Sequence, residues 1–68
     1  MNHFTYYHQD RKPVGLRRYQ KNQQEGEKWD LDEHKWTRHC APRRAAEITG
    51  DRIIDQREAE DLFPGSTR

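Results

Sequence analysis

The chain has 68 residues, of which 37% are charged and 29% hydrophobic, and its formal net charge is only +1. These residues suffice for one small domain, and the near-neutral charge excludes a strongly polycationic chain. Because the chain has so few hydrophobic residues, we expect a fold of marginal stability that a partner, a second copy or a metal would stabilise.

The distribution of charge and the single cysteine indicate which kinds of partner and which cellular compartment to expect. Residues 1–28 carry six Lys/Arg and three acids, whereas residues 45–68 carry three Lys/Arg and six acids. Such a dipolar chain suits head-to-tail self-association, including a homodimer, as well as it suits a nucleic-acid face. The one cysteine cannot form an internal disulfide, and no stretch is apolar enough to span a membrane. We therefore expect a cytoplasmic protein, located in the host cytosol or the virion if a phage encodes it.

Residues 1–19 are predicted to form a basic, aromatic β-hairpin or extended arm. Residues 3–8 are rich in aromatic and β-branched types, and alternation places Phe4, Tyr6 and His8 on one face of a strand. Residues 14–20 suit a return strand. Residues 20–28 contain no apolar residue and are predicted to be a polar linker.

Residues 29–40, with the sequence WDLDEHKWTRHC, are predicted to form the first of three short helices. Asp30 has the capping-box spacing with Glu33, and a proline at position 42 ends the segment. On a helix, Trp29, Trp36 and Cys40 fall within about 40° of one another and would form a narrow aromatic stripe.

Two further helices are predicted at residues 41–49 and 55–63. Gly50 is placed to end the first, and Asp55 with Glu58 has capping-box spacing at the start of the second. Residues 66–68 are expected to fray. The sequence thus predicts a small α+β domain with a hairpin or arm at residues 1–19, a linker at 20–28 and a helical part at 29–65. Its helices are expected to pack through Trp29, Leu31, Trp36, Ile48, Ile54, Leu62 and Phe63.

Neither a metal centre nor a catalytic centre is indicated by the spacing of the histidines and the cysteine. His34 and His39 are five residues apart and would point about 140° apart on a helix. His39 and Cys40 are adjacent, so their side chains would not face each other. We predict no enzyme activity and no cofactor. A small zinc-stabilised module is the weakest alternative, and its ligands would be drawn from His3, His8, His39 and Cys40.

Nucleic-acid binding is an alternative function that rests on basic and aromatic residues near the predicted hairpin. Tyrosines there would stack on bases while cations contact phosphates. In addition, residues 43–50, RRAAEITG, resemble the Ala-x-x-x-Gly core of a helix-turn-helix, although Asp51 stands where an apolar residue is expected. The cations predicted to contact phosphates are Arg11, Lys12, Arg17, Arg18, Lys21, Arg43 and Arg44.

Protein binding is the function that the sequence favours. A small core and concentrated Trp, Tyr and Arg are typical of an interface-forming protein, because these residue types carry most binding energy at interfaces. We expect a non-catalytic regulatory or adaptor protein that binds a larger protein or complex, similar in size and composition to small bacterial or phage accessory proteins. The residues predicted to contact the partner are Tyr6, Tyr7, Arg17, Arg18, Tyr19, Trp29 and Trp36.

Overall fold

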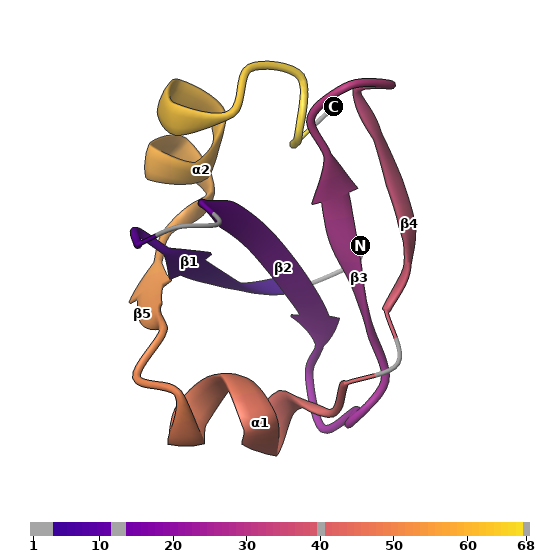
Figure 1. The fold of residues 1–68 in the computed structure, drawn as a ribbon, viewed down its shortest axis with the longest axis vertical. Helices are drawn as coiled ribbons and strands as arrows, with labels where there is room; N and C mark the ends of the chain where they lie inside the picture. Colours follow the sequence, from indigo (N-terminus) through magenta and orange to yellow (C-terminus); the bar gives the residue numbers. More distant parts are fainter. Residues whose placement is uncertain (1–3, 12–13, 40, 68) are drawn as a thin grey trace.

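Four strands follow one another along the chain, and a fifth returns to pair with the first (Figure 1). A computed structural model describes residues 4–11, 14–39 and 41–67. All neighbouring strands are antiparallel, in the sheet order β4-β3-β2-β1-β5. The elements are β1 (Phe4–Gln9), β2 (Gly15–Gln20), β3 (Gly26–Asp30), β4 (Lys35–His39), α1 (Arg43–Ile48), β5 (Arg52–Ile54) and α2 (Gln56–Leu62).

The predicted fold class, a hairpin followed by three helices, is wrong, because the segment expected to be the first helix is a β-hairpin. Asp30 does cap the backbone there, since its Oδ1 accepts hydrogen bonds from the N–H groups of Asp32 (2.9 Å) and Glu33 (3.0 Å). The turn it caps reverses the chain instead of continuing as a helix. His34 ends this turn with a φ of 54°, and its N–H donates to the Asp30 carbonyl (2.8 Å).

The two tryptophans meet as a cross-strand pair. Trp29 on β3 lies opposite Trp36 on β4, and their ring centroids are 5.3 Å apart in an edge-to-face arrangement. Because side chains alternate along a strand, Trp36 and Arg38 occupy one face of β4, and Lys35 and Thr37 occupy the other. The aromatic stripe predicted for a helix is therefore one row of a sheet.

Other predicted elements are confirmed. The N-terminal hairpin is present as β1 and β2, and the two later helices are present as α1 and α2. The Asp55 side chain caps α2 by accepting a hydrogen bond from the Glu58 N–H (2.8 Å), and Gly50 follows α1 with a φ of +77°. The strands β3, β4 and β5 were not predicted, and β3 takes up the last part of the expected linker.

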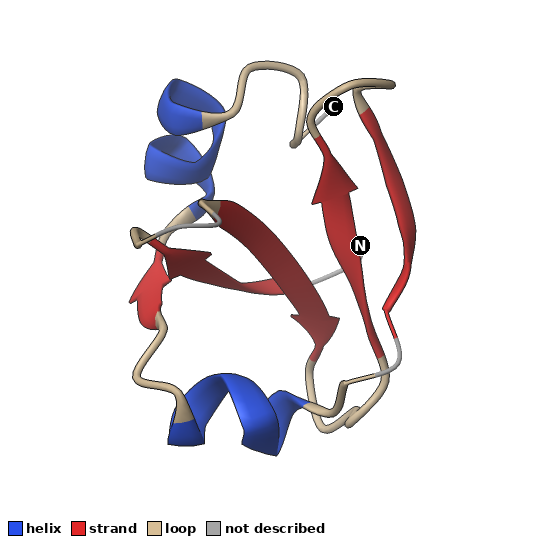
Figure 2. Ribbon diagram, viewed as in Figure 1, coloured by secondary structure: helices blue, strands red, loops and turns tan. Residues whose placement is uncertain are grey.

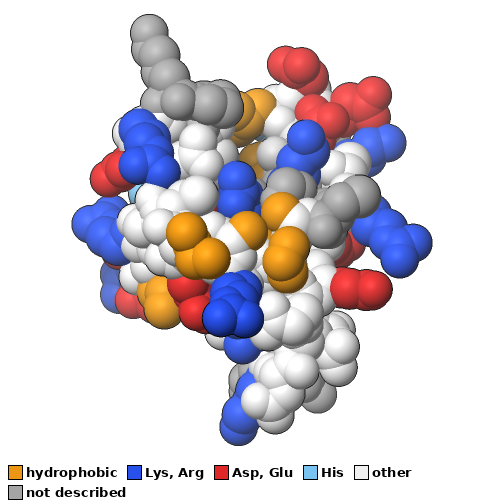
Figure 3. All heavy atoms as spheres, turned by 60° about the horizontal axis from the view of Figure 1, so that its bottom comes forward, with side chains coloured by type: hydrophobic (Ala, Val, Ile, Leu, Met, Phe, Trp, Pro, Cys, Tyr) orange, Lys and Arg blue, Asp and Glu red, His pale blue; other side chains and the backbone are white. Residues whose placement is uncertain are grey.

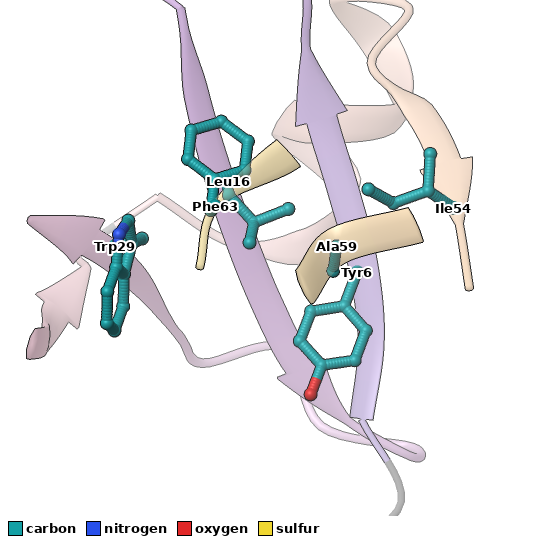
Figure 4. Close-up of a cluster of buried hydrophobic side chains, with 6 residues drawn as sticks. All are labelled: Tyr6, Leu16, Trp29, Ile54, Ala59 and Phe63. Atoms are coloured by element: carbon teal, nitrogen blue, oxygen red, sulfur yellow. The ribbon is translucent and has the colours of Figure 1, made fainter. Parts of the chain in front are cut away.

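The sheet is covered on both sides by one short helix each, α2 on one side and α1 on the other (Figure 2). On the α1 side, Tyr7 and Tyr19 pack with Ala46 of the helix. The larger core lies on the α2 side, where Ala59 and Phe63 reach the strands (Figure 4). Its members are Tyr6, Leu16, Trp29, Ile54, Ala59 and Phe63.

Several residues expected in the core lie on the surface instead. Leu31, Ile48 and Leu62 are exposed, because the first belongs to a turn and the other two end short helices. Ser66 and Thr67 lie in the tail that was expected to fray, and the side chain of each forms a hydrogen bond to α2. Ser66 is fully buried, and the Oγ1 of Thr67 donates to a carboxylate of α2. No helix in the part of the chain that the structure describes is long and apolar enough to cross a membrane.

Candidate binding surface

Three side chains form a stack on the α2 side of the sheet, and we call Phe4, Arg18 and Trp36 the aromatic stack. The guanidinium carbon of Arg18 lies 4.2 Å from the ring centroid of Phe4 and 4.1 Å from that of Trp36. A guanidinium held between two rings gains cation–π attraction on both sides. The indole N–H of Trp36 donates to the Ser66 carbonyl (2.8 Å), which fixes the orientation of the ring.

The strand register continues this stack as a row of alternating charges. Arg18 on β2 lies opposite Glu27 on β3, which in turn lies opposite Arg38 on β4. The Nε and Nη2 atoms of Arg18 are each 2.8 Å from Oε1 of Glu27. Arg38 forms only a 3.9 Å ion pair with Glu25, and both of these side chains are 85% exposed.

An open groove adjoins this row where the helix α2 does not cover the sheet. Its volume is about 270 Å³. Aromatic, basic, acidic and amide groups meet in it, so it can hold both an apolar group and a charged group of a partner. The groove is lined by Phe4, Arg18, Gln20, Gln23, Glu25, Gly26, Glu27 and Arg38.

Polar contacts on the α1 side of the sheet hold the helix in place. The Tyr7 hydroxyl donates to Glu47 (3.4 Å), and the Tyr19 hydroxyl donates to the Ala41 carbonyl (3.1 Å). Arg17 lies 3.5 Å from the buried carboxylate of Asp51. Burial raises the pKa of both tyrosines above the usual 10.0, and the carboxylate of Glu47 adds to the shift for Tyr7. These phenols stay protonated and act as structural donors.

Four of the cations predicted to contact phosphates are engaged within the protein. Arg11 donates to the Thr49 carbonyl and Arg43 to the Gln20 carbonyl, both at 2.6 Å. Arg17 and Arg18 form the ion pairs given above. Lys21 and Arg44 are exposed, and Lys12 lies outside the described residues. In Figure 3 the face that includes α1 mixes basic, acidic and apolar side chains.

Of the seven residues predicted to contact a partner, three are partly accessible and four are buried. Arg18 and Trp36 come together in the aromatic stack and remain partly accessible. Arg17 is also partly accessible but lies on the α1 side of the sheet. The others are buried in the two cores: Tyr6, Tyr7, Tyr19 and Trp29.

Of the four candidate metal ligands, only His8 has a side chain that the structure describes. His8 is buried with its ring against Phe63, at a centroid distance of 5.7 Å. His3 and Cys40 lie outside the described residues, as does the side chain of His39. Within residues 4–11, 14–39 and 41–67, no group of three or more His, Cys, Asp or Glu side chains has an arrangement suited to a metal ion.

Four residues of the candidate surface were not predicted from the sequence, namely Phe4, Glu25, Glu27 and Arg38. The alternation in residues 3–8 already placed Phe4 on the face of Tyr6. Glu27 and Arg38 could be found only by recognising β3 and β4 as strands. No family model, characterised protein or solved structure matches the chain.

Proposed function

We propose that the protein is a non-catalytic binding module that regulates or adapts a larger protein or complex through the aromatic stack and the adjoining groove. The observation that carries the proposal is the partly exposed Phe4–Arg18–Trp36 stack beside Glu27 and Arg38. Aromatic and arginine side chains held in a fixed orientation lose little conformational entropy when they bind, and they dominate the energetics of interfaces.

A protein partner is favoured over a nucleic acid by how the basic residues are used. Arg11, Arg17, Arg18 and Arg43 are already bonded within the protein, and contacts to phosphates would compete with these bonds. The tyrosines predicted to stack on bases are buried. Any nucleic-acid binding by the exposed cations would weaken steeply and log-linearly with salt concentration.

Photo-crosslinking from two matched positions tests this function. Gln23 lines the groove and Gln56 begins α2, and both side chains are exposed. A photoreactive amino acid placed at position 23 in cells should give discrete protein adducts that the same amino acid at position 56 does not give. Adducts to nucleic acid at position 23, or equal protein adducts from both positions, would contradict the proposal.

A further inference from the structure

The strand β4 forms one edge of the sheet, at the right of Figure 1. All five of its residues pair with β3 on the inner side. On the outer side, no other strand in the described ranges pairs with it. An edge strand presents a row of unpaired N–H and C=O groups, which is the template on which an extended peptide can add. The opposite edge, β5, has only three residues.

The side chains of β4 give this edge a positive charge. Its sequence, KWTRH, contains two cations and no carboxylate. Lys35 is 60% exposed and Arg38 is 85% exposed. Their ion-pair partners, Glu33 and Glu25, are also mostly exposed, and surface pairs of this kind are readily exchanged for other carboxylates.

We propose that the partner contributes an acidic extended segment that adds to the outer side of β4 as an antiparallel sixth strand. This inference rests on the proposed function and names the chemistry of the partner. From the amino end of the partner segment, its first residue would be a carboxylate opposite Arg38, and its second a β-branched residue opposite Thr37. The third would be an apolar residue opposite Trp36, and the fourth a second carboxylate opposite Lys35. Opposite charges and aromatic–aliphatic contacts are the favourable cross-strand pairs.

Alternation places the contacts of this segment on both sides of the sheet. Residues opposite Trp36 and Arg38 would extend the surface formed by the aromatic stack. Residues opposite Lys35 and Thr37 would face the other side, where Lys28 is the neighbour of Thr37 on β3. The added backbone hydrogen bonds would supply affinity and the charges would select acidic sequences.

Charged side chains on an edge strand can also serve to prevent pairing with other chains. That role predicts that β4 binds neither acidic nor basic strands. The two roles are therefore separated by measuring whether a peptide of the inferred chemistry binds at β4.

The test uses the full chain labelled with ¹⁵N and two synthetic peptides, one with Glu-Thr-Val-Glu repeats and one with Lys-Thr-Val-Lys repeats. The acidic peptide should slow amide hydrogen exchange along β4 and leave β5 unchanged. Its affinity should exceed that of the basic peptide by about tenfold or more. The variant Lys35→Glu/Arg38→Glu should reverse this preference, and Arg57→Glu, at an exposed site on α2, should retain it.

Several outcomes would overturn the inference. These are no binding of the acidic peptide, a preference that the charge reversal leaves unchanged, and protection at β5 instead of β4. Protection of β4 amides that rises with protein concentration in the absence of peptide would assign the edge to a second copy. Crosslinking at Gln23 without protection of β4 would leave the proposed function intact and remove only the added strand.

Discussion

Gly26 lies so close to Tyr19 and to the backbone of β2 that a side chain at this position would clash with them. A Cβ atom there would lie 2.5 Å from Cδ1 and Cε1 of Tyr19 and 2.6 Å from the Arg18 carbonyl oxygen. Gly26→Ala should therefore lower the free energy of unfolding by about 1–3 kcal/mol, measured by urea denaturation. Gly15→Ala is the control, because nothing lies within 4 Å of its Cβ position, and it should leave stability unchanged or raise it slightly. Equal effects of the two substitutions would contradict the packing described here.

The buried tyrosines Tyr7 and Tyr19 predict a loss of stability at alkaline pH. Burial raises their pKa above 10.0 in the folded chain, so between 10.0 and the raised values the folded state binds more protons than the unfolded state. The free energy of unfolding should then fall as the pH rises through this window. Urea midpoints at about pH 9 and about pH 11 measure the fall, and Tyr7→Phe/Tyr19→Phe should reduce it. An unchanged pH dependence in this variant would assign the effect to other groups.

At the level of elements, the turn of the β3–β4 hairpin is held by the side chain of Asp30. Backbone N–H groups, that of Glu33 foremost, donate to Asp30 and hold the pKa of its carboxyl below the usual 3.8. Asp30→Ala removes the hydrogen-bond acceptor and should lower the urea midpoint. Asp30→Asn keeps a side-chain oxygen in place, so its urea midpoint should stay close to that of the unchanged protein. If Ala and Asn had the same effect, the turn would not depend on this acceptor.

The same hairpin shows why the sequence predicted some elements and not others. Capping spacing at Asp55 correctly indicated α2, because a helix start is decided by neighbours within one turn. The equivalent spacing at Asp30 marks a reversing turn. Trp29 and Trp36 are seven positions apart, and this spacing suits a helical stripe as well as a cross-strand pair. The segment forms a hairpin instead of a helix because β3 pairs with β2. The residues of β2 lie outside the segment, so the segment's own pattern does not reveal this pairing.

The candidate surface could be predicted only in part for the same reason. Arg18 and Trp36 were expected to contact a partner, since Arg and Trp are typical of interfaces. Their meeting with Phe4, Glu27 and Arg38 requires the register of four strands. No local pattern of residue types encodes that register, because it follows from how the whole sheet pairs.

At the scale of the molecule, two small cores on opposite sides of one sheet replace the single helical core that the sequence pattern predicted. Each side is closed by a helix of six or seven residues, so the sheet supplies most of the structure. This arrangement leaves one end of the α2 side and the edge β4 open to a partner. Every functional proposal therefore depends on residues 35–39 forming an edge strand.

Nuclear Overhauser contacts in the free protein would show whether residues 35–39 form this edge strand. The sheet predicts backbone contacts between the facing residues Lys28 and Thr37 on β3 and β4, and between Tyr7 and Ile53 on β1 and β5. Contacts between residues three apart throughout 30–39, with none across Lys28 and Thr37, would show a helix in that segment. That result would contradict both the sheet and the surface built on it.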